Sequence, residues 1–599
     1  MLIILQKIFD ILDKDQKNKI FKIQIANLIV SLFEIITLGS LAIFIGLLAS
    51  KENIFDNSYL LSFYNYFEFA NKFEFMFFLG IIVLSLYIFT GILNIVVTWK
   101  SNVMSSTINQ YMNNLIIKNY VYKNWQEFTK LKLSDINKDL FTDLNILSNS
   151  VVVPLFNLFN KVFIAISLLL TLIVYNYKVA LLGALIYSVV YFFLLMFVKK
   201  INSKITKNIS INRKKNHAFI HNFFSGFKEV IIFNLRNPIF EKIKKNNIGM
   251  IYPTSFLLSL TQIPRFFVEL ISYIVIISGI LFIIKTGDNL DNLLPMVAVY
   301  AFAGLKLLPA FQQIYLAYVR IKAGQTAMNN LYPKIIKAKK ENLISQHEKT
   351  NEKLNFKKDI KLNNVSFYYD KSSKKPSVKN LNLSIKKNTI VGLAGPSGGG
   401  KSTIIDIISG LLSPSKGSIL IDGENLNKND LRKWQNNFGA VTQMPFLSGD
   451  KIVDNISFNK IRGKIDHKKL DELINRVELK NFIKKQKKGL NSKISDRGIN
   501  ISGGERQRIA IARSLYFENE IIIFDEATNA LDKITENKII GFIKKLRRFK
   551  TIIIITHRTN TLKVCDNIFL INDGSIIQSG KYKKLENSSK LFKKLISDD

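Results

Sequence analysis

GPSGGGKST, residues Gly395 to Thr403, decides the fold of the carboxyl-terminal half of this 599-residue chain. The stretch fits the pattern G-x-x-x-x-G-K-[ST], follows the apolar segment TIVGLAG and precedes STIIDIISGLL, which has helical spacing. A strand, a glycine-rich turn and a helix in this order predict a phosphate-binding loop. Small residues let backbone N–H groups surround phosphate oxygens at the positive end of the helix.

The loop residues have expected roles in holding ATP. Lys401 would contact the β and γ phosphates, and the hydroxyl of Ser402 would coordinate Mg2+. The expected nucleotide-binding set of this loop is Gly395, Pro396, Ser397, Gly398, Gly399, Gly400, Lys401, Ser402 and Thr403.

Two carboxylates follow the apolar strand IIIF. Asp525 is placed to reach the magnesium shell, and Glu526 is placed to polarise the water that attacks the γ phosphate. A strand-end turn without a catalytic role is the alternative, which the phosphate loop upstream disfavours.

A second amide-rich turn lies at a helix start in NISGGERQR, Asn500–Arg508. Ser502, Gly503 and Gly504 of this turn suit a γ phosphate. Because the domain already has a complete phosphate loop, we expect this turn to act on the nucleotide of another copy of the chain.

The segments around these motifs predict a soluble α/β domain. Short apolar strands such as SILID, IIIFD and TIIIIT alternate with helical stretches. Before them, 321–358 is polar and rich in Lys, Glu and Asn, which predicts a linker. The expected organisation is a membrane domain over 1–320, this linker, and a nucleotide-binding domain over 359–599.

Six apolar runs of the membrane domain are each near the ~20 residues that cross ~30 Å of hydrocarbon. They lie at 23–49, 76–98, 152–175, 178–198, 257–284 and 292–317. Lys-rich segments before the first run and after the fourth put both termini in the cytoplasm. The long cytoplasmic segments 99–151 and 199–256 have helical spacing, so the spanning helices are expected to continue below the membrane.

Two flanking segments are expected to lie along membrane surfaces. Met1–Lys22 begins with MLIIL but is broken by Asp and Lys, which favours an amphipathic helix over a signal peptide. Phe55–Phe67 clusters aromatic residues and predicts either a short outer amphipathic helix or a compact external loop.

The net charge of +39 suggests nucleic-acid binding, but many basic residues flank the apolar runs, and we expect no nucleic-acid partner. The single cysteine, Cys565, excludes an intramolecular disulfide framework.

Residues 359–590 resemble the ATPase domain of ABC transporters, whose signature stands here as Ile501-Ser502-Gly503-Gly504-Glu505. The resemblance implies RecA-like and helical subdomains, ATP and Mg2+ as cofactors, and hydrolysis. It also implies roles for residues that mean little singly. Tyr369 would stack on adenine, Gln443 would sense magnesium, Asp532 would communicate across a dimer, and His557 would orient the γ phosphate.

Six spans before one ATPase domain resemble a half-size, type IV ABC exporter of the inner membrane. One phosphate loop and one signature per chain imply a dimer, of two identical chains or of this chain and a sibling. Asn124–Lys130 and Gly226–Phe233 look like coupling helices that dock on ATPase domains; a solvated charged face is the alternative.

Glu34, Arg265 and Lys306 are charged residues inside the apolar runs, where burial costs several kcal/mol without a partner. Glu34 is expected near mid-membrane, and Arg265 and Lys306 at one inner level that suits an anionic headgroup. The alternatives are a helical pair of Arg265 with Glu269, and a Lys306 that reaches the inner interface.

The membrane half is most similar to the lipid-linked oligosaccharide flippase of bacterial protein N-glycosylation, through ILDKDQKN, LFEIITLG, NWQEFTKLKLSDI and IPRFFVE. This resemblance implies a polyprenyl-pyrophosphate glycan as cargo. Lys306 and Thr90 replace arginines of that family, which weakens the implication. A multidrug, lipid A or other glycerolipid, or peptide exporter is the alternative.

Overall fold

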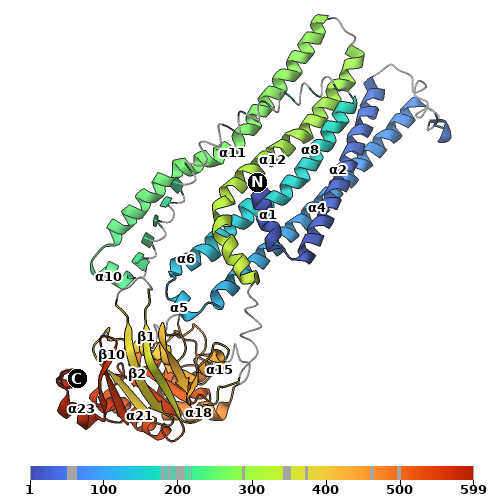
Figure 1. Cartoon of the computed structure of the whole chain (residues 1–599). Helices are drawn as coiled ribbons and strands as arrows, with labels where there is room; N and C mark the ends of the chain where they lie inside the picture. Colours follow the sequence, from blue (N-terminus) through green and yellow to red (C-terminus); the bar gives the residue numbers. More distant parts are fainter. Residues whose placement is uncertain are drawn as a thin grey trace. The chain divides into compact units, whose positions relative to one another are not determined.

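The computed structural model describes residues 2–49, 62, 64–69, 71–175, 226–286, 290–340, 352–370, 375–458, 465–495 and 501–597, with isolated positions between 177 and 224. The chain divides into two compact units (Figure 1). The first unit is Met1–Tyr122 with Leu131–Asn342, and the second is Lys123–Lys130 with Leu343–Asp599.

The first unit is built from helices. They are α1 (Leu2–Ile11), α2 (Lys14–Ala49), α4 (Lys72–Val121), α6 (Leu133–Asn137), α7 (Leu144–Leu147), α8 (Val153–Tyr175), α10 (Phe227–Ile232), α11 (Arg236–Thr286) and α12 (Leu290–Lys340), with π-helical turns η2 (Lys138–Asp143) and η3 (Ser148–Val152). Helix α4 has 50 residues, so it is about 75 Å long at 1.5 Å per residue and extends beyond any hydrocarbon layer.

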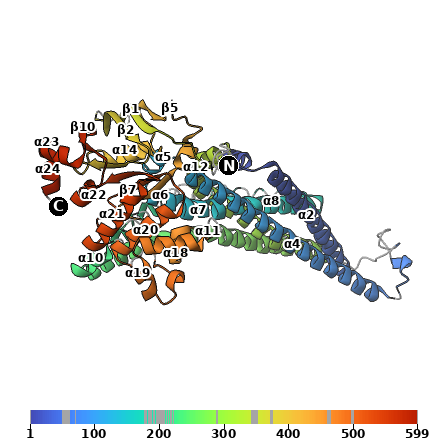
Figure 2. The same ribbon diagram turned by 90° about the horizontal axis from the view of Figure 1, so that it is seen from below.

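Helices α2, α4, α8 and α12 pack against one another along their lengths (Figures 1 and 2). Small side chains mediate the close approach: Ala165 of α8 and Ala303 and Ala310 of α12 are buried with Leu38 of α2. In an apolar solvent, contacts of this kind let helix backbones approach and gain van der Waals contact.

Five of the six expected spans coincide with described helices, namely α2, α4, α8, α11 and α12, except that Val152 at the start of the third span belongs to η3. The expected fourth span, 178–198, and most of the outer segment 55–67 lie outside the described residues. Among the residues described, three stretches are long and apolar enough to cross a membrane: Lys14–Ile45, Phe73–Val121 and Leu133–Val174.

The amino-terminal helix differs from expectation in what covers its apolar face. Ile4, Ile8 and Ile11 of α1 are buried in a protein core that also contains residues of α12. Lys7 donates from Nζ to Asn329 Oδ1 at 2.7 Å, which ties the polar side to α12 as well. The apolar face of α1 therefore packs against apolar side chains of α12 and not against lipid.

The linker is shorter than predicted, because α12 continues to Lys340. Met328, Leu331, Ile335 and Ala338 are fully buried. These apolar residues recur every three or four positions, which is the period of an amphipathic helix. The abundance of Lys and Asn on the other face of this helix led to the prediction of a linker from 321 onward.

The second unit contains two sheets. The antiparallel sheet has the order β2-β1-β4-β5 and the larger sheet has the order β10-β9-β3-β8-β7-β6, parallel except for β10. The strands are β1 (Asp359–Phe367), β2 (Val378–Lys386), β3 (Ile390–Ala394), β4 (Lys416–Ile421), β5 (Glu424–Asn425), β6 (Phe438–Val441), β7 (Ile521–Asp525), β8 (Thr551–Ile555), β9 (Asn567–Asn572) and β10 (Ser575–Gly580).

The helices of this unit surround the sheets. They are α5 (Trp125–Phe128), α14 (Lys401–Ile408), α15 (Leu431–Gln435), α16 (Ile452–Ser457), α18 (His467–Arg476), α19 (Lys480–Lys485), the short 3-10 turn η4 (Gly489–Asn491), α20 (Gly503–Tyr516), α21 (Lys533–Leu546), α22 (Thr559–Leu562), α23 (Tyr582–Ser588) and α24 (Lys590–Ser597).

Two cores cover the two faces of the larger sheet. Successive strand residues point to opposite faces, so Ile522 and Phe524 belong to the core that contains α20 and α21, while Ile521 and Ile523 belong to the core that contains α14 and the antiparallel sheet. Figure 2 shows α14, β1 and β2 on one side of β7 and α20 and α21 on the other. The carboxyl ends of β3, β7 and β8 thereby meet at one edge, where the expected nucleotide residues lie.

Candidate functional site

The phosphate loop connects β3 to α14 in a backbone conformation that only glycine accommodates. Gly395 has a φ of +151°, and a Cβ there would lie 2.0 Å from the carbonyl oxygen of Ile571. Gly400, the residue before α14, has a φ of +100°, and its Cβ would lie 2.9 Å from the carbonyl oxygen of Ser377. The loop is thus packed against neighbouring backbone, and within it the Gly399 N–H donates to the Pro396 carbonyl oxygen at 3.1 Å.

Lys401 lies inside this loop. Its ammonium donates hydrogen bonds of 2.8 Å to the carbonyl oxygens of Gly395 and Pro396. Burial lowers the pKa of Lys401, and the carboxylates of Glu526 and Asp525 act in the opposite direction. A partly desolvated cation at this position would be stabilised by phosphate oxygens.

Asp525 ends β7 next to the loop. Burial raises the pKa of this carboxyl group, with further contributions from the charges of Glu526 and Asp406, and Lys401 opposes the shift. A cation bound here would relieve the buried negative charge. The oxygen donors of Asp525, Ser402 and Gln443 suit Mg2+, which is held in phosphate sites by one or two carboxylates together with the phosphates. These three residues could therefore hold the ion.

Glu526 has a φ of +49°, an uncommon conformation for a non-glycine residue that costs on the order of 1–3 kcal/mol. Its Oε2 accepts hydrogen bonds from Gln443 Nε2 at 2.7 Å and from Asn529 Nδ2 at 3.0 Å. The structure thus brings Gln443 and Glu526 together, although 83 positions separate them. Asn529 was not among the predicted residues.

The signature turn begins α20 with a complete capping box. Ser502 Oγ accepts from the Glu505 backbone N–H at 3.2 Å, and the Glu505 carboxylate accepts from the Ser502 N–H at 2.8 Å. A Cβ on Gly503 would lie 3.2 Å from Cβ of Ala530, and one on Gly504 would lie 3.1 Å from the Ala530 carbonyl oxygen. The glycines allow this helix start to lie directly on the segment after Glu526.

Gln507 of α20 bridges to the same segment. Its Nε2 donates to the Glu526 carbonyl oxygen at 3.4 Å, and its Oε1 accepts from the Ala530 N–H at 3.1 Å. Asp532, two residues after Ala530, caps α21 by accepting a hydrogen bond from the Thr535 N–H at 2.9 Å. This hydrogen bond lowers the pKa of Asp532. A displacement of the signature helix would therefore act on the backbone that carries Glu526.

The two remaining predicted nucleotide residues lie near the loop and after β8. Tyr369 places its hydroxyl 3.2 Å from that of Thr403, and its ring packs edge-on against Phe367 with 5.0 Å between centroids. The Tyr369 side chain is 40% exposed, which leaves a surface for a planar ligand. His557 is exposed directly after β8.

The short helix α5 belongs to the same compact unit as these residues. Trp125 Nε1 donates to Asp406 Oδ2 at 3.3 Å. Asp406 lies in α14, the helix that the phosphate loop begins, and burial raises the pKa of its carboxyl group while the Trp125 hydrogen bond lowers it. One residue of the predicted coupling segment therefore contacts the phosphate-loop helix.

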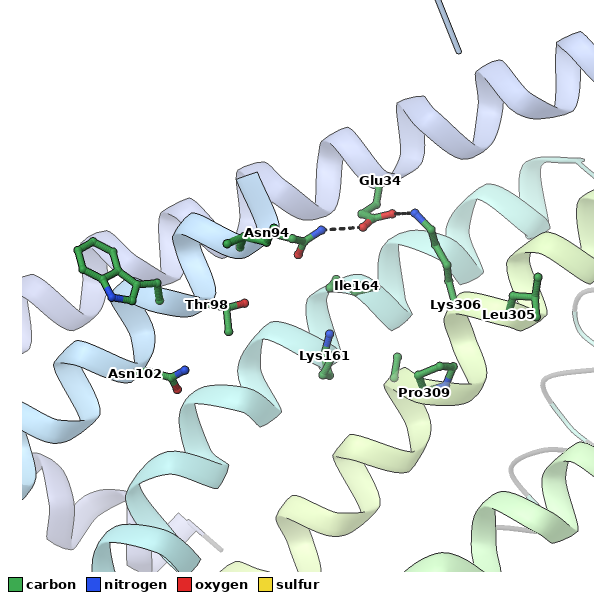
Figure 3. Close-up of a pocket in the computed structure, with 12 residues that line it drawn as sticks. Glu34, Asn94, Thr98, Asn102, Lys161, Ile164, Leu305, Lys306 and Pro309 are labelled. Atoms are coloured by element: carbon green, nitrogen blue, oxygen red, sulfur yellow. Dashed lines mark hydrogen bonds and ion pairs between the residues drawn. The ribbon is translucent and has the colours of Figure 1, made fainter. Parts of the chain in front are cut away.

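The first unit contains an open cavity of about 590 Å³ between α2, α4, α8 and α12 (Figure 3). Glu34 and Lys306 form an ion pair across it, and Asn94 Nδ2 donates to the second oxygen of Glu34 at 2.9 Å. The Lys306 ammonium also lies 4.8 Å from the centre of the Tyr87 ring. The charge of Lys306 is thereby compensated within the protein. The sequence had suggested an anionic headgroup or the inner membrane interface as the partner of Lys306, and not Glu34.

Arg265 does not join this cluster. Its Nε donates to Glu269 Oε1 at 2.7 Å, and its side chain is 55% exposed. This is the helical pair at four-residue spacing that the sequence offered as the alternative role. Arg265 is not among the residues that line the cavity.

Lys161 of α8 lines the same cavity and was missed in the sequence. The signal was present: a lysine inside the apolar run 152–175 satisfies the rule that selected Glu34 and Lys306. Lys161 lies nine residues into that run, so the same reasoning would have selected it.

Comparisons with known proteins follow this division of the chain. The family "ABC transporter transmembrane region" matches residues 23–301, and the family "ABC transporter" matches residues 378–529. The solved structure of a bacterial Atm1-family ABC exporter with ATP bound superposes with a TM-score of 0.76, covering 97% of this chain and 98% of that one at 17% identity. The chain has the domains and fold of a half-size ABC exporter.

Curated relatives match this chain in part. ABC transporter B family member 29 of Arabidopsis thaliana is 33% identical over 317 residues, which is 52% of this chain and 47% of the relative. The ATP-dependent lipid A-core flippase of Wigglesworthia glossinidia brevipalpis is 39% identical over 229 residues, 38% of this chain and 39% of the relative. The chain spans about half or less of the length of these two relatives.

Proposed function

We propose that this ABC exporter is an ATP-driven flippase that moves an amphipathic lipid across the inner membrane, with its ATPase unit in the cytoplasm. The observation that carries the proposal is the charged cluster inside the cavity of the helical unit. Charges among apolar helices are costly, and they are kept where they line a pathway for a polar group. A polar headgroup in this cavity, with apolar chains against the helices, matches an amphipathic cargo.

ATP would supply the energy for the cycle. The backbone of the phosphate loop and Lys401 would bind the phosphates, and the Tyr369 ring would support the base. Mg2+ would neutralise charge that develops on the phosphates. Glu526, oriented by Gln443 and Asn529, would accept a proton from the attacking water, and His557 would contact the γ phosphate.

The proposed assembly is a homodimer, in which Ser502, Gly503 and Gly504 of one chain meet the nucleotide held by Lys401 of the other. Support comes from the single phosphate loop and single signature turn per chain. A pair formed with a sibling half-transporter is the alternative assembly.

Cysteines introduced at Ser397 and Ser502 test this arrangement. Burial raises the pKa of the native Cys565 thiol to about 12, which keeps its background reaction low. Disulfides between two chains are expected during ATP turnover. Disulfides confined to single chains would rule out the shared nucleotide site.

Helix α5 is proposed as the coupling element of this unit. Its Trp125 contact with Asp406 would link movement of the membrane helices to the phosphate-loop helix. Helix α10 is proposed as the second coupling element, and its exposed Phe227, Ile231 and Ile232 offer an apolar surface for docking.

The proposed cargo is a lipid-linked oligosaccharide or a similar polyprenyl-pyrophosphate glycan, in line with the resemblance of the membrane half. The relatives named lipid A-core flippase favour a lipid cargo more generally. The second candidate cargo is a glycerolipid such as lipid A. A drug or a peptide is a further alternative cargo.

Transport in proteoliposomes tests the function. Flipping of a fluorescently labelled lipid-linked glycan, ATP-dependent and lost in Glu526→Gln, is expected. A labelled lipid A and a labelled peptide are run in parallel. ATP-dependent movement of the peptide alone, or of no lipid at all, would refute the lipid flippase.

A further inference from the structure

Lys161 differs from the other charged residues that line the cavity. Both oxygens of Glu34 are engaged, one by Lys306 and the other by Asn94. Within the described parts of the chain, Lys161 forms no hydrogen bond or ion pair, although it lies within electrostatic reach of Glu34. The cluster of two ammonium groups and one carboxylate therefore carries one surplus positive charge, and Lys161 holds it.

The position of Lys161 makes that charge available to a ligand. Lys161 is half-buried on α8 and lines the cavity, and Figure 3 shows its side chain rising from α8 between α4 and α12. It lies eight residues after Val153, about 12 Å along the helix, well inside the apolar stretch. An ammonium group in such surroundings needs water or an anion to stay ionised.

A polar stripe on α4 adds to this site. Asn94, Thr98 and Asn102 recur every four residues and all line the cavity. Residues at this spacing lie on one face of a helix. Their amide and hydroxyl groups can donate and accept hydrogen bonds, as a hydroxyl-rich headgroup requires. Ile95 and Ile164 provide apolar surface beside them.

We propose that Lys161 binds the phosphate of an amphipathic lipid in this cavity, while the stripe of Asn94, Thr98 and Asn102 binds the remaining headgroup. This inference rests on the proposed function and names the residue that selects anionic cargo. The Glu34–Lys306 ion pair stays intact and presents a polar surface without net charge to the cavity. A cationic amphipath would be repelled by the surplus charge.

Binding to the full chain in phosphatidylcholine nanodiscs tests the inference. The probes are a polyprenyl phosphate, the neutral polyprenol of equal length, and inorganic phosphate. Trp99 lines the cavity, so its fluorescence reports occupancy, and Trp99→Phe identifies that signal. The variants are Lys161→Gln, Lys161→Arg and, as a matched control, Lys100→Gln, which removes a charge from an exposed position of α4 outside the lining.

Lys161→Gln is expected to raise the Kd of the polyprenyl phosphate by at least about tenfold, because a charge-assisted bond is lost, and to leave that of polyprenol within about twofold. Lys161→Arg should stay within about threefold of the wild type, since it keeps the charge. Lys100→Gln should bind like the wild type.

Three results would overturn parts of this picture in distinguishable ways. Equal binding of the phosphate by wild type and Lys161→Gln, with lipid flipping intact, would refute the role of Lys161 and leave the flippase standing. Inorganic phosphate that competes as well as the lipid phosphate would refute the amphipathic ligand. Absence of both lipid binding and lipid flipping in the wild type would refute the proposed function itself.

Discussion

Alanine at two glycines of the phosphate loop should have very different effects. At Gly398 the φ is +77° and no atom lies within 4 Å of the added Cβ. Gly398→Ala should therefore lower the free energy of unfolding only through the left-handed backbone conformation, by about 1–2 kcal/mol. At Gly395 the Cβ would lie 2.0 Å from the Ile571 carbonyl oxygen, and this separation must open to at least 3.4 Å. Because β9, which carries Ile571, is paired with β3, the movement would break the register Ala394↔Leu570. Overpacking adds about 1–3 kcal/mol, so Gly395→Ala should cost about 2–5 kcal/mol.

Calorimetry of the full chain in detergent measures this difference. One kcal/mol shifts the midpoint of a domain of this size by about 2–4 °C, so Gly398→Ala should lower the ATPase-domain transition by about 2–8 °C and Gly395→Ala by about 4–20 °C. A fluorescent ATP analogue should bind the first variant weakly and the second not measurably. Equal midpoint shifts in the two variants would refute the steric argument, since only one of the added methyl groups meets an obstacle.

Three further changes test the site. Glu526→Gln should bind ATP but hydrolyse it about 10²–10⁴-fold more slowly, because the proton acceptor is lost; near-normal turnover would show that another group is the base. Asp525→Asn should raise the unfolding midpoint in magnesium-free buffer at neutral pH. Burial and the charge of Glu526 raise the pKa of Asp525 above its ordinary 3.8, so the folded state binds the extra proton and this group's contribution to stability falls as pH rises through the folded pKa. The variant should lose that pH dependence, and an unchanged profile of midpoint against pH would contradict it. Trp125→Phe removes the hydrogen bond to Asp406 and should reduce lipid-stimulated hydrolysis more than basal hydrolysis, as phosphate-release assays can measure; an equal loss in both would argue against a coupling role.

The sequence alone determined the features that depend on a few neighbouring residues. The glycines at Gly395 and Gly400 and the helix start at Ser502 follow from spacings of up to five residues, and the pair of Arg265 with Glu269 stood as one of two alternatives at the same range. Length and hydropathy placed the described spans for the same reason, since the number of apolar residues needed to cross a membrane does not depend on what packs beside them.

Only the tertiary structure decided which side chains meet across elements. Glu34 and Lys306 are 272 positions apart, and Gln443 and Glu526 are 83 positions apart. Whether Lys161 faces the cavity depends on the rotation of α8 about its axis, which its packing against α2 and α12 sets. Periodicity identifies a helix from local backbone geometry, but its register against its neighbours follows from the summed contacts of side chains distant in sequence.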